Sequence, residues 1–136
     1  MILPPSSEKR LKGVHPDLVR VVRRCAADWR DKTFTWFITC GPRSIEEQRL
    51  LVKKGASKTM RSRHLVAKNG FAHAIDVAAM LDGKVRWDWP LYVKIAVAMK
   101  QAAKQEGVVI EAGLDWKSFP DGPHHQLPWS THTGLK

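Results

Sequence analysis

The sequence has no long hydrophobic run. Charged residues interrupt every apolar stretch well before the roughly 18 consecutive apolar residues that a membrane-spanning helix needs. The segment from Met1 to Arg10 also lacks the basic start, apolar centre and small-residue cleavage site of a secretory signal peptide. From the sequence alone we therefore expect a soluble protein that is made in a cytoplasm.

Cysteine is scarce, with two residues in 136, and neither belongs to a Cys-x-x-Cys pair. A chain of this length does not need a disulfide framework, and without such a pair the usual sign of a cysteine-based metal or redox site is missing. Cys25 shares the apolar face of a predicted helix with Leu18, Val22 and Trp29, so we expect it to pack in the core.

Acidic residues are also few. Lys and Arg outnumber Asp and Glu by 23 to 13, which gives a formal net charge of +10. A charge this large predicts attraction to a polyanion, and nucleic acid, an anionic cell envelope and acidic lipid head groups are all eligible. The charge alone does not choose among these partners.

The length and composition predict one domain, residues 1–136. A hydrophobic content of 43% that includes six tryptophans is enough for one compact core. The first ten residues are polar and contain prolines, so residues 1–10 are predicted to form a mobile leader.

Apolar residues at helical spacing predict three helices. The first follows His15-Pro16 and extends to Trp29, because proline is acceptable in a first turn. The second opens at a capping box and the third at an aspartate, and each ends at a glycine. The residues that mark these two helices are Ser44, Glu47 and Gly55 for the second and Asp88 and Gly107 for the third.

Strands are predicted between these helices. β-branched and aromatic residues mark 34–40, 73–80, 108–111 and 124–127, with a turn at Asp82-Gly83 and an extended loop over 56–70. Helices and strands alternate without regular βαβ units. The predicted fold is therefore α+β, a single compact domain with a small, mainly antiparallel sheet packed against about three helices.

Three short segments carry candidate metal ligands: His64 in Ser-Arg-His-Leu, Asp76 in Ala-His-Ala-Ile-Asp, and His124 in Asp-Gly-Pro-His. Catalytic zinc sites commonly take three such ligands and leave a fourth position for water or substrate. The segments resemble the zinc metallopeptidase family of D-alanyl-D-alanine carboxypeptidases and phage L-alanyl-D-glutamate endolysins, whose pattern is SxH, then GxAxD or a close variant, then DxxH. The resemblance runs from about Glu8 to Pro128.

Two further segments strengthen this resemblance. Gly41-Pro42-Arg43 with Gln48 is similar to the family's Gly-x-Arg and downstream glutamine. Residues 113–116 (GLDW) are similar to its Gly-x-Asp-Trp motif before the last histidine. Five motifs that are weak one by one form a specific pattern because they occur in the same order.

The resemblance implies that His64, Asp76 and His124 bind one Zn²⁺ at the edge of the sheet, that Asp121 is the catalytic acid/base, and that Arg43 stabilises the oxyanion. Zinc lowers the pKa of water and polarises a carbonyl, a carboxylate can transfer the proton, and a guanidinium can stabilise the developing charge. The implied reaction is hydrolysis of an amide bond in peptidoglycan stem peptide, with the L-alanyl-D-glutamate bond as the best guess.

Two alternatives stay open at this point. A D-alanyl-D-alanine carboxypeptidase would use the same metal site, because the motifs define the chemistry and not the side chains of the substrate. The positive charge and the histidine-rich segments also permit a basic nucleic-acid-binding protein or a metal nuclease.

The sequence departs from the family pattern around Asp76. Eleven residues (65–75) separate His64 from Asp76, more than is usual in the family, and Lys68-Asn69-Gly70 predicts an inserted turn. His73 is a competing ligand, but on a strand positions 73 and 76 point to opposite faces. By the same alternation His125 should point away from whatever His124 faces, and the role of Gln126 stays open.

Contacts with the substrate are predicted for Gln48, Ser62 and His73, although Gln48 and Ser62 can equally satisfy local backbone groups. Trp87, Trp89 and Trp129 are candidate groove-lining residues. Basic residues on the first helix and in the following loop either form a solvated face or capture anionic envelope polymers. These basic residues are Arg20, Arg23, Arg24, Lys53, Lys54, Lys58, Arg61 and Arg63.

The resemblance also implies how such an enzyme is deployed. A single-domain endolysin without a signal peptide would be made in the host cytoplasm and would act on peptidoglycan in the periplasm after another factor opens the membrane. A monomer is the default expectation for a small hydrolase of a solid substrate.

Overall fold

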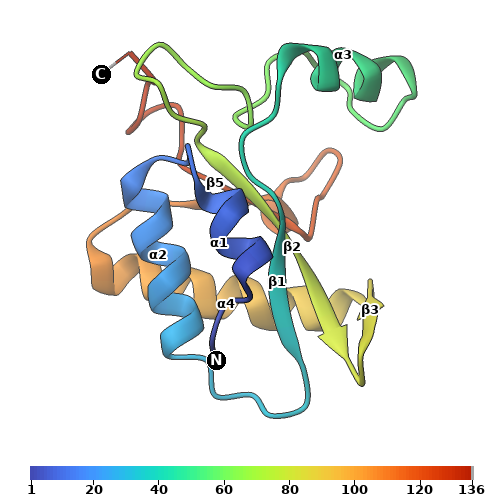
Figure 1. Cartoon of the computed structure of the whole chain (residues 1–136), viewed down its shortest axis with the longest axis vertical. Coiled ribbons are helices and arrows are strands. Elements are labelled where there is room, and N and C mark those ends of the chain that lie inside the picture. Colours follow the sequence, from blue (N-terminus) through green and yellow to red (C-terminus); the bar gives the residue numbers. More distant parts are fainter. Residues whose placement is uncertain (136) are drawn as a thin grey trace.

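The computed structural model describes residues 1–135 and has the predicted α+β architecture. Five strands form one sheet in the order β1-β2-β5-β4, with β3 paired to β2, and all of these pairings are antiparallel (Figure 1). The strands are β1 (Thr35–Cys40), β2 (Ala74–Leu81), β3 (Lys84–Arg86), β4 (Glu111–Ala112) and β5 (His124–Gln126). The helices are α1 (Pro5–Leu11), α2 (Pro16–Ala27), α3 (Ile45–Lys53) and α4 (Trp89–Glu106), with a 3₁₀ turn, η1, at Gly113–Asp115.

One hydrophobic core joins the sheet to α2 and α4. Leu18 and Cys25 from α2, Met99 from α4 and Ile75 from β2 are all buried in the same cluster. The free thiol of Cys25 is 2% exposed, so the predicted packing role of this cysteine is confirmed. In contrast, α3 and the loop around it extend beyond the end of the sheet, away from α2 and α4 (Figure 1).

The prediction of a mobile leader over residues 1–10 is wrong. Residues from Pro5 onward form α1, which lies along the outer edge of β1. The hydroxyl of Ser7, which is fully buried, accepts a hydrogen bond from the Ile38 N–H at 2.9 Å, and Arg10 donates to the Ile38 carbonyl at 3.2 Å. An edge strand exposes unpaired backbone groups, and α1 satisfies two of them while covering this edge. The polar composition gave no sign of this helix, because its buried contact with β1 is made by the polar side chain of Ser7.

Two other predicted features differ from the structure. Residues 108–111 were expected to form a strand, but only Glu111 and Ala112 pair with β5, because β5 itself has only three residues. Asp88 occupies the N-cap position of α4, yet its carboxylate binds Arg86 at 2.6 Å and makes no capping bond. The capping box at Ser44 and the left-handed glycine that ends α4 are both as predicted.

Within residues 1–135 no helix is long and apolar enough to cross a membrane.

We expect Ser7→Ala to lower the free energy of unfolding by about 1–3 kcal/mol, because the Ile38 N–H would stay buried without an acceptor. Ser6→Ala is the matched control, since Ser6 is exposed in the same helix and should change stability by less than about 0.5 kcal/mol. Urea unfolding followed by circular dichroism measures both. Equal effects of the two substitutions would refute the assignment of Ser7 as a structural acceptor.

Candidate active site

The strand register brings Asp76 and His124 together. Asp76 on β2 is paired with His124 on β5, and on its other side it is paired with Cys40, where β1 has an irregularity in register. Residues directly opposite each other on antiparallel strands project from the same face of the sheet. The central strand therefore presents the Asp76 carboxylate between groups from both neighbouring strands.

His64 reaches the same place from the loop that follows α3. Its carbonyl accepts a hydrogen bond from the Arg43 N–H at 2.8 Å, and its own N–H donates to the Ser62 hydroxyl at 3.1 Å. Its ring Nδ1 lies 2.8 Å from the Gly41 carbonyl oxygen. Gly41 must be glycine because a Cβ there would lie 1.9 Å from the Arg10 carbonyl oxygen. This close approach fixes the backbone that orients the His64 ring.

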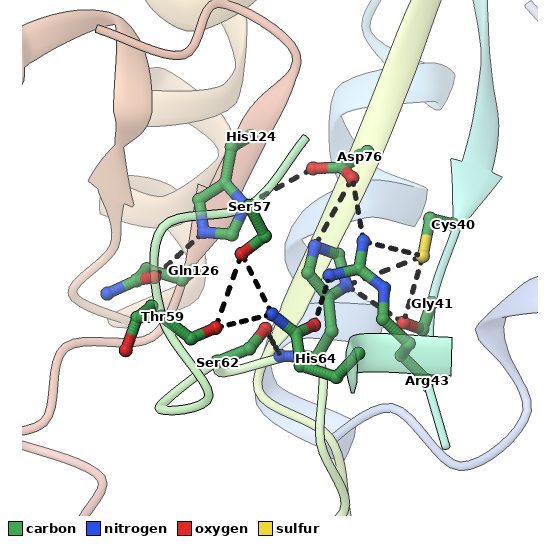
Figure 2. A network of polar contacts seen from close by, with 11 residues as sticks. Cys40, Gly41, Arg43, Ser57, Thr59, Ser62, His64, Asp76, His124 and Gln126 are labelled. Atoms are coloured by element: carbon green, nitrogen blue, oxygen red, sulfur yellow. Dashed lines mark hydrogen bonds and ion pairs between the residues drawn. The ribbon is translucent and has the colours of Figure 1, made fainter. Parts of the chain in front are cut away.

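The three predicted ligands converge as Figure 2 shows. His64 Nε2 lies 3.3 Å from Asp76 Oδ2, and His124 Nδ1 lies 3.2 Å from Asp76 Oδ1. Ligand atoms bound about 2.0–2.1 Å from a tetrahedral zinc lie roughly 3.3–3.4 Å from one another. Each histidine nitrogen therefore lies at the spacing of two zinc ligands from one oxygen of Asp76. Asp76 is also the residue shared by the two candidate metal-binding groups at the site, which are Cys40, His64 and Asp76, and Asp76, Asp121 and His124.

The second nitrogen of each histidine is held by a neighbour, which also favours metal binding. His64 Nδ1–H can donate to the Gly41 carbonyl, and His124 Nε2–H can donate to Gln126 Oε1 at 2.8 Å. These tautomers leave the lone pairs of His64 Nε2 and His124 Nδ1 facing Asp76, and among residues 1–135 the buried His64 Nε2 has no hydrogen-bond partner. Metal-binding histidines commonly have such outer partners.

The electrostatics of the cluster favour a cation beside Asp76. Burial alone would raise the pKa of Asp76, but its contacts with His124 and His64 hold that pKa well below the usual range. Burial would likewise lower the pKa of His64, but the contacts with Asp76 and Cys40 raise it above its ordinary value. A positive charge is thus needed at this position, and either a proton or a metal ion can supply it.

Asp121 stands beside this group in the loop before β5. Its carboxylate belongs, with Asp76 and His124, to a set of ligand atoms that all lie within 4.8 Å of one another. The Asp121 N–H donates to the Gly113 carbonyl at 2.8 Å, and this hydrogen bond holds the loop against η1. Loss of solvent around the carboxylate and the charge of Asp76 both raise the pKa of Asp121.

Arg43 also contacts Asp76. One guanidinium nitrogen is 3.7 Å from Asp76 Oδ2 and another donates to Gln48 Oε1 at 2.7 Å. Gln48 is fully buried and donates through Nε2 to the Ser57 hydroxyl and to the Thr59 carbonyl. Gln48 therefore positions Arg43 and the loop, and the structure does not bear out its expected contact with substrate.

A cavity of about 360 Å³ opens over these groups. Ser62 lines it, as expected of a substrate contact, while its hydroxyl also holds the His64 backbone. Trp129 lines it too, whereas Trp87 and Trp89 lie outside its lining and are exposed elsewhere. The lining is formed by Arg43, Leu51, Ala56, Ser57, Thr59, Arg61, Ser62, Arg63, His64, Asp76, Trp116, Asp121, His124, Gln126 and Trp129.

Comparison with known proteins decides the family. The family described as phage L-alanyl-D-glutamate peptidase matches residues 2–127. This chain belongs to that family. The L-alanyl-D-glutamate peptidase of Escherichia phage T5 is 30% identical over 133 residues, which are 95% of this chain and 90% of that protein.

Two other similar proteins agree with this family assignment. The L-alanyl-D-glutamate peptidase of Listeria phage A118 is 40% identical over 85 residues, 62% of this chain but only 27% of that longer protein. The crystal structure of the L-Ala D-Glu endopeptidase ChiX of Serratia marcescens superposes with a TM-score of 0.82 and 43% identity, over 94% of this chain and 90% of that one.

The structure gives no support to the predicted contact between His73 and substrate. His73 immediately precedes β2, is 1% exposed and lies outside the cavity lining. Its ring centroid is 5.2 Å from that of His15, which in turn is 5.1 Å from that of His132. Asp17 binds His132 at 2.8 Å and also binds Arg20, so this second histidine group anchors the C-terminal segment to α2.

The residues inserted between His64 and Asp76 form the expected turn. The Gly70 N–H donates to the Ala67 carbonyl at 2.9 Å, and the Asn69 N–H donates to the Gly134 carbonyl at 2.8 Å. Gly134 has φ of +86°, and a Cβ there would lie 2.8 Å from Ala67 Cβ. The longer spacing therefore leaves the ligands in place and provides a docking point for the end of the chain.

Sequence reasoning did not predict the residues that contact the rings of His64 and His124. Cys40 Sγ lies 3.6 Å from His64 Nδ1, and Gln126 Oε1 accepts from His124. Strand alternation could have found Gln126, because residues 124 and 126 share a face. His125, between them, is fully buried and lies outside the cavity lining, and within residues 1–135 neither of its ring nitrogens has a hydrogen-bond partner; this agrees with the predicted alternation.

In metal-free protein we expect Cys40 to react with a thiol reagent about tenfold or more faster than Cys25. Burial would raise the pKa of Cys40, but the His64 contact and the Arg43 charge lower it, whereas burial raises the pKa of Cys25 to about 12. Time-resolved labelling with peptide mapping measures both thiols. Cys40→Ser should remove the fast phase and His64→Gln should slow it, whereas equal rates for the two thiols would contradict the Cys40–His64 contact.

Proposed function

We propose that this chain is a zinc-dependent peptidase that hydrolyses the L-alanyl-D-glutamate bond of peptidoglycan stem peptide. The observation that carries the proposal is the convergence of His64 Nε2, Asp76 and His124 Nδ1 at the cavity, beside Asp121. The relatives from phages T5 and A118 are both L-alanyl-D-glutamate peptidases by name, which supports the choice of bond.

In this proposal His64, Asp76 and His124 hold the ion. A zinc ion supplies Lewis-acid chemistry, because it lowers the pKa of water and polarises the carbonyl of the scissile amide. Gly41 and Gln126 fix the two rings by accepting from their outer nitrogens, so the ligating atoms are oriented before any ion arrives.

Asp121 is the proposed general base and acid. Its carboxylate accepts a proton from the attacking water and later donates that proton to the leaving amine, so that the amide C–N bond breaks without releasing an amide anion. The raised pKa of Asp121 supports this role, since a carboxylate with an ordinary pKa would be a poorer proton donor near neutral pH.

Arg43 is proposed to stabilise the oxygen of the tetrahedral intermediate. Its guanidinium is held by Gln48 and Cys40 and stays near Asp76 at the floor of the cavity. A donor fixed in this way costs no reorganisation when negative charge develops on the carbonyl oxygen.

The alternative of a D-alanyl-D-alanine carboxypeptidase predicts a different product. Digestion of purified walls should release new N-terminal D-glutamate if the proposal holds, and free D-alanine if the alternative holds.

The nucleic-acid alternative is weakened by the structure, because three basic residues of α2 are already paired with carboxylates. These pairs are Arg20 with Asp17, Arg23 with Glu8, and Arg24 with Glu106.

The remaining positive charge is proposed to attract anionic envelope polymers. Lys53 and Lys54 lie at the end of α3 and Lys58 lies in the following loop, all on the side of the molecule that carries the cavity wall. Arg63 does not belong to this surface, because it is 4% exposed. The route from host cytoplasm to periplasm after membrane opening, and the monomeric state, stay predictions.

Zinc affinity should rise with pH between about pH 6 and pH 8, by roughly tenfold per unit for each proton displaced. The raised pKa of His64 means that metal-free protein holds a proton there, which zinc must displace, while the lowered pKa of Asp76 keeps its carboxylate ionised throughout. Competition with a chromophoric chelator measures this affinity.

Asp76→Asn should abolish the tight zinc site, and Asp82→Asn is the matched control, because Asp82 lies in an exposed turn away from the cavity. Retention of tight zinc binding by folded Asp76→Asn would refute the ligand assignment.

Asp121→Asn should lower the rate of wall lysis by about 10²- to 10⁴-fold while the zinc content stays unchanged. Asp82→Asn is the matched control, because Asp82 lies in an exposed turn with φ of 52°, which asparagine tolerates well. Turbidity loss of outer-membrane-stripped walls, with zinc measured in the same samples, tests both variants. A zinc-loaded Asp121→Asn protein that lyses walls at the wild-type rate would remove Asp121 from the mechanism.

A further inference from the structure

We infer that Arg61, seated on Trp129, binds the free carboxylate of the substrate's glutamate and thereby makes the enzyme selective for an acidic residue at the scissile bond. The inference rests on the proposed function and assigns a residue to substrate selection. It starts from the cations that line the cavity, which are Arg43, Arg61 and Arg63.

Two of these three guanidinium groups are already occupied. Arg43 is shared among Asp76, Gln48 and Cys40. Arg63 is buried and donates through Nε to the Leu127 carbonyl at 3.1 Å and through a terminal nitrogen to the His132 carbonyl. Arg43 is already assigned to the oxygen of the tetrahedral intermediate, and Arg63 is only 4% exposed, so neither is left for a carboxylate of the substrate.

Arg61 is exposed and has no acidic partner among residues 1–135. Its guanidinium carbon lies 4.3 Å from the centre of the Trp129 ring, and its backbone N–H donates to the Thr59 hydroxyl at 2.9 Å. A guanidinium stacked on an aromatic face keeps its edge donors free to bind a carboxylate through two parallel hydrogen bonds. Arg61 is therefore the one cavity-lining guanidinium in this part of the chain that is available to an incoming anion.

The ring beneath Arg61 is fixed in place. The Trp129 ring centre also lies 4.1 Å from the guanidinium carbon of Arg63, which the two backbone carbonyls hold. Trp129 lies shortly after the end of β5, the strand that carries His124. The guanidinium of Arg61 is thus held on a rigid platform connected to a metal-binding strand, as a specificity contact requires.

The charge distribution of the cavity explains why such a contact is needed. Asp76 and Asp121 lie together at one end of the cavity, and neither carboxylate can donate a hydrogen bond to a substrate carboxylate, so such a group needs a cationic partner elsewhere in the lining. Glutamate has two carboxyl groups and can continue a peptide through only one of them, so the other remains an anion close to the scissile nitrogen. Arg61 offers that anion a partner within the same cavity.

The test compares two soluble substrates that differ at one group. One is an L-alanyl-D-glutamyl peptide with its free carboxylate, and the other carries the uncharged amide at that position. Wild type should cleave the carboxylate peptide with about ten- to hundredfold higher kcat/KM, the range expected for a charge-assisted contact. Arg61→Gln should remove that preference by raising KM for the carboxylate peptide alone. Arg61→Lys, which keeps the charge but loses the paired donors, should fall between the two.

Arg49→Gln is the matched control, because Arg49 is exposed on α3 outside the cavity and its loss removes the same net charge. Loss of preference in both variants would show a general charge effect and overturn the assignment of Arg61. An unchanged preference in Arg61→Gln would also overturn it, although cleavage of both peptides by that variant would leave the proposed peptidase function standing. Failure of the wild type to cleave either peptide would instead count against the proposed function itself.

Discussion

The site depends on one partly buried carboxylate, that of Asp76, in the central strand of the sheet. Asp76 carries a negative charge between His64, His124 and Arg43, and burial makes that charge costly unless positive groups compensate for it. Each of these three groups comes from a different segment of the chain. The need to compensate one charge therefore ties together a loop before α3, a loop after it and the last strand.

The backbone meets this requirement through two close contacts. Gly41 lets the end of β1 pass against the Arg10 carbonyl, and the same glycine's carbonyl orients His64. Gly113 lets η1 pass against the loop that holds Asp121, since a Cβ there would lie 2.5 Å from the Asp121 carbonyl oxygen. Both glycines belong to the motifs that the sequence displays. In these motifs glycine is needed for close packing, and the chemistry comes from the residues around it.

The end of the chain takes part in the same construction. His132 is bound by Asp17 of α2, and Gly134 accepts a hydrogen bond from the turn inserted before β2. Between these contacts and β5, Trp129 is held against Arg63 at the wall of the cavity. The polar contacts of the tail thus determine the shape of the cavity, and the longer spacing between His64 and Asp76 is part of that arrangement.

The sequence by itself determined the elements whose signals are local. Apolar periodicity and capping residues marked α2, α3 and α4, and β-branched and aromatic content marked β1 and β2, because these signals depend only on near neighbours. The ordered motifs selected His64, Asp76 and His124 as candidate ligands, which the fold brings together, and strand alternation separated His125 from His124. Such inferences need no knowledge of which segments meet.

Tertiary structure alone decided the rest, because those features depend on pairing between distant residues. Ser7 is a structural acceptor only because α1 lies on the edge of β1. His73 packs beside His15 and so does not line the cavity where substrate would bind. Gln48 became a support for Arg43 only when the loop after α3 closed over it. Composition and spacing describe what a residue can do, and the partner that the fold places beside it decides which of these possibilities is realised.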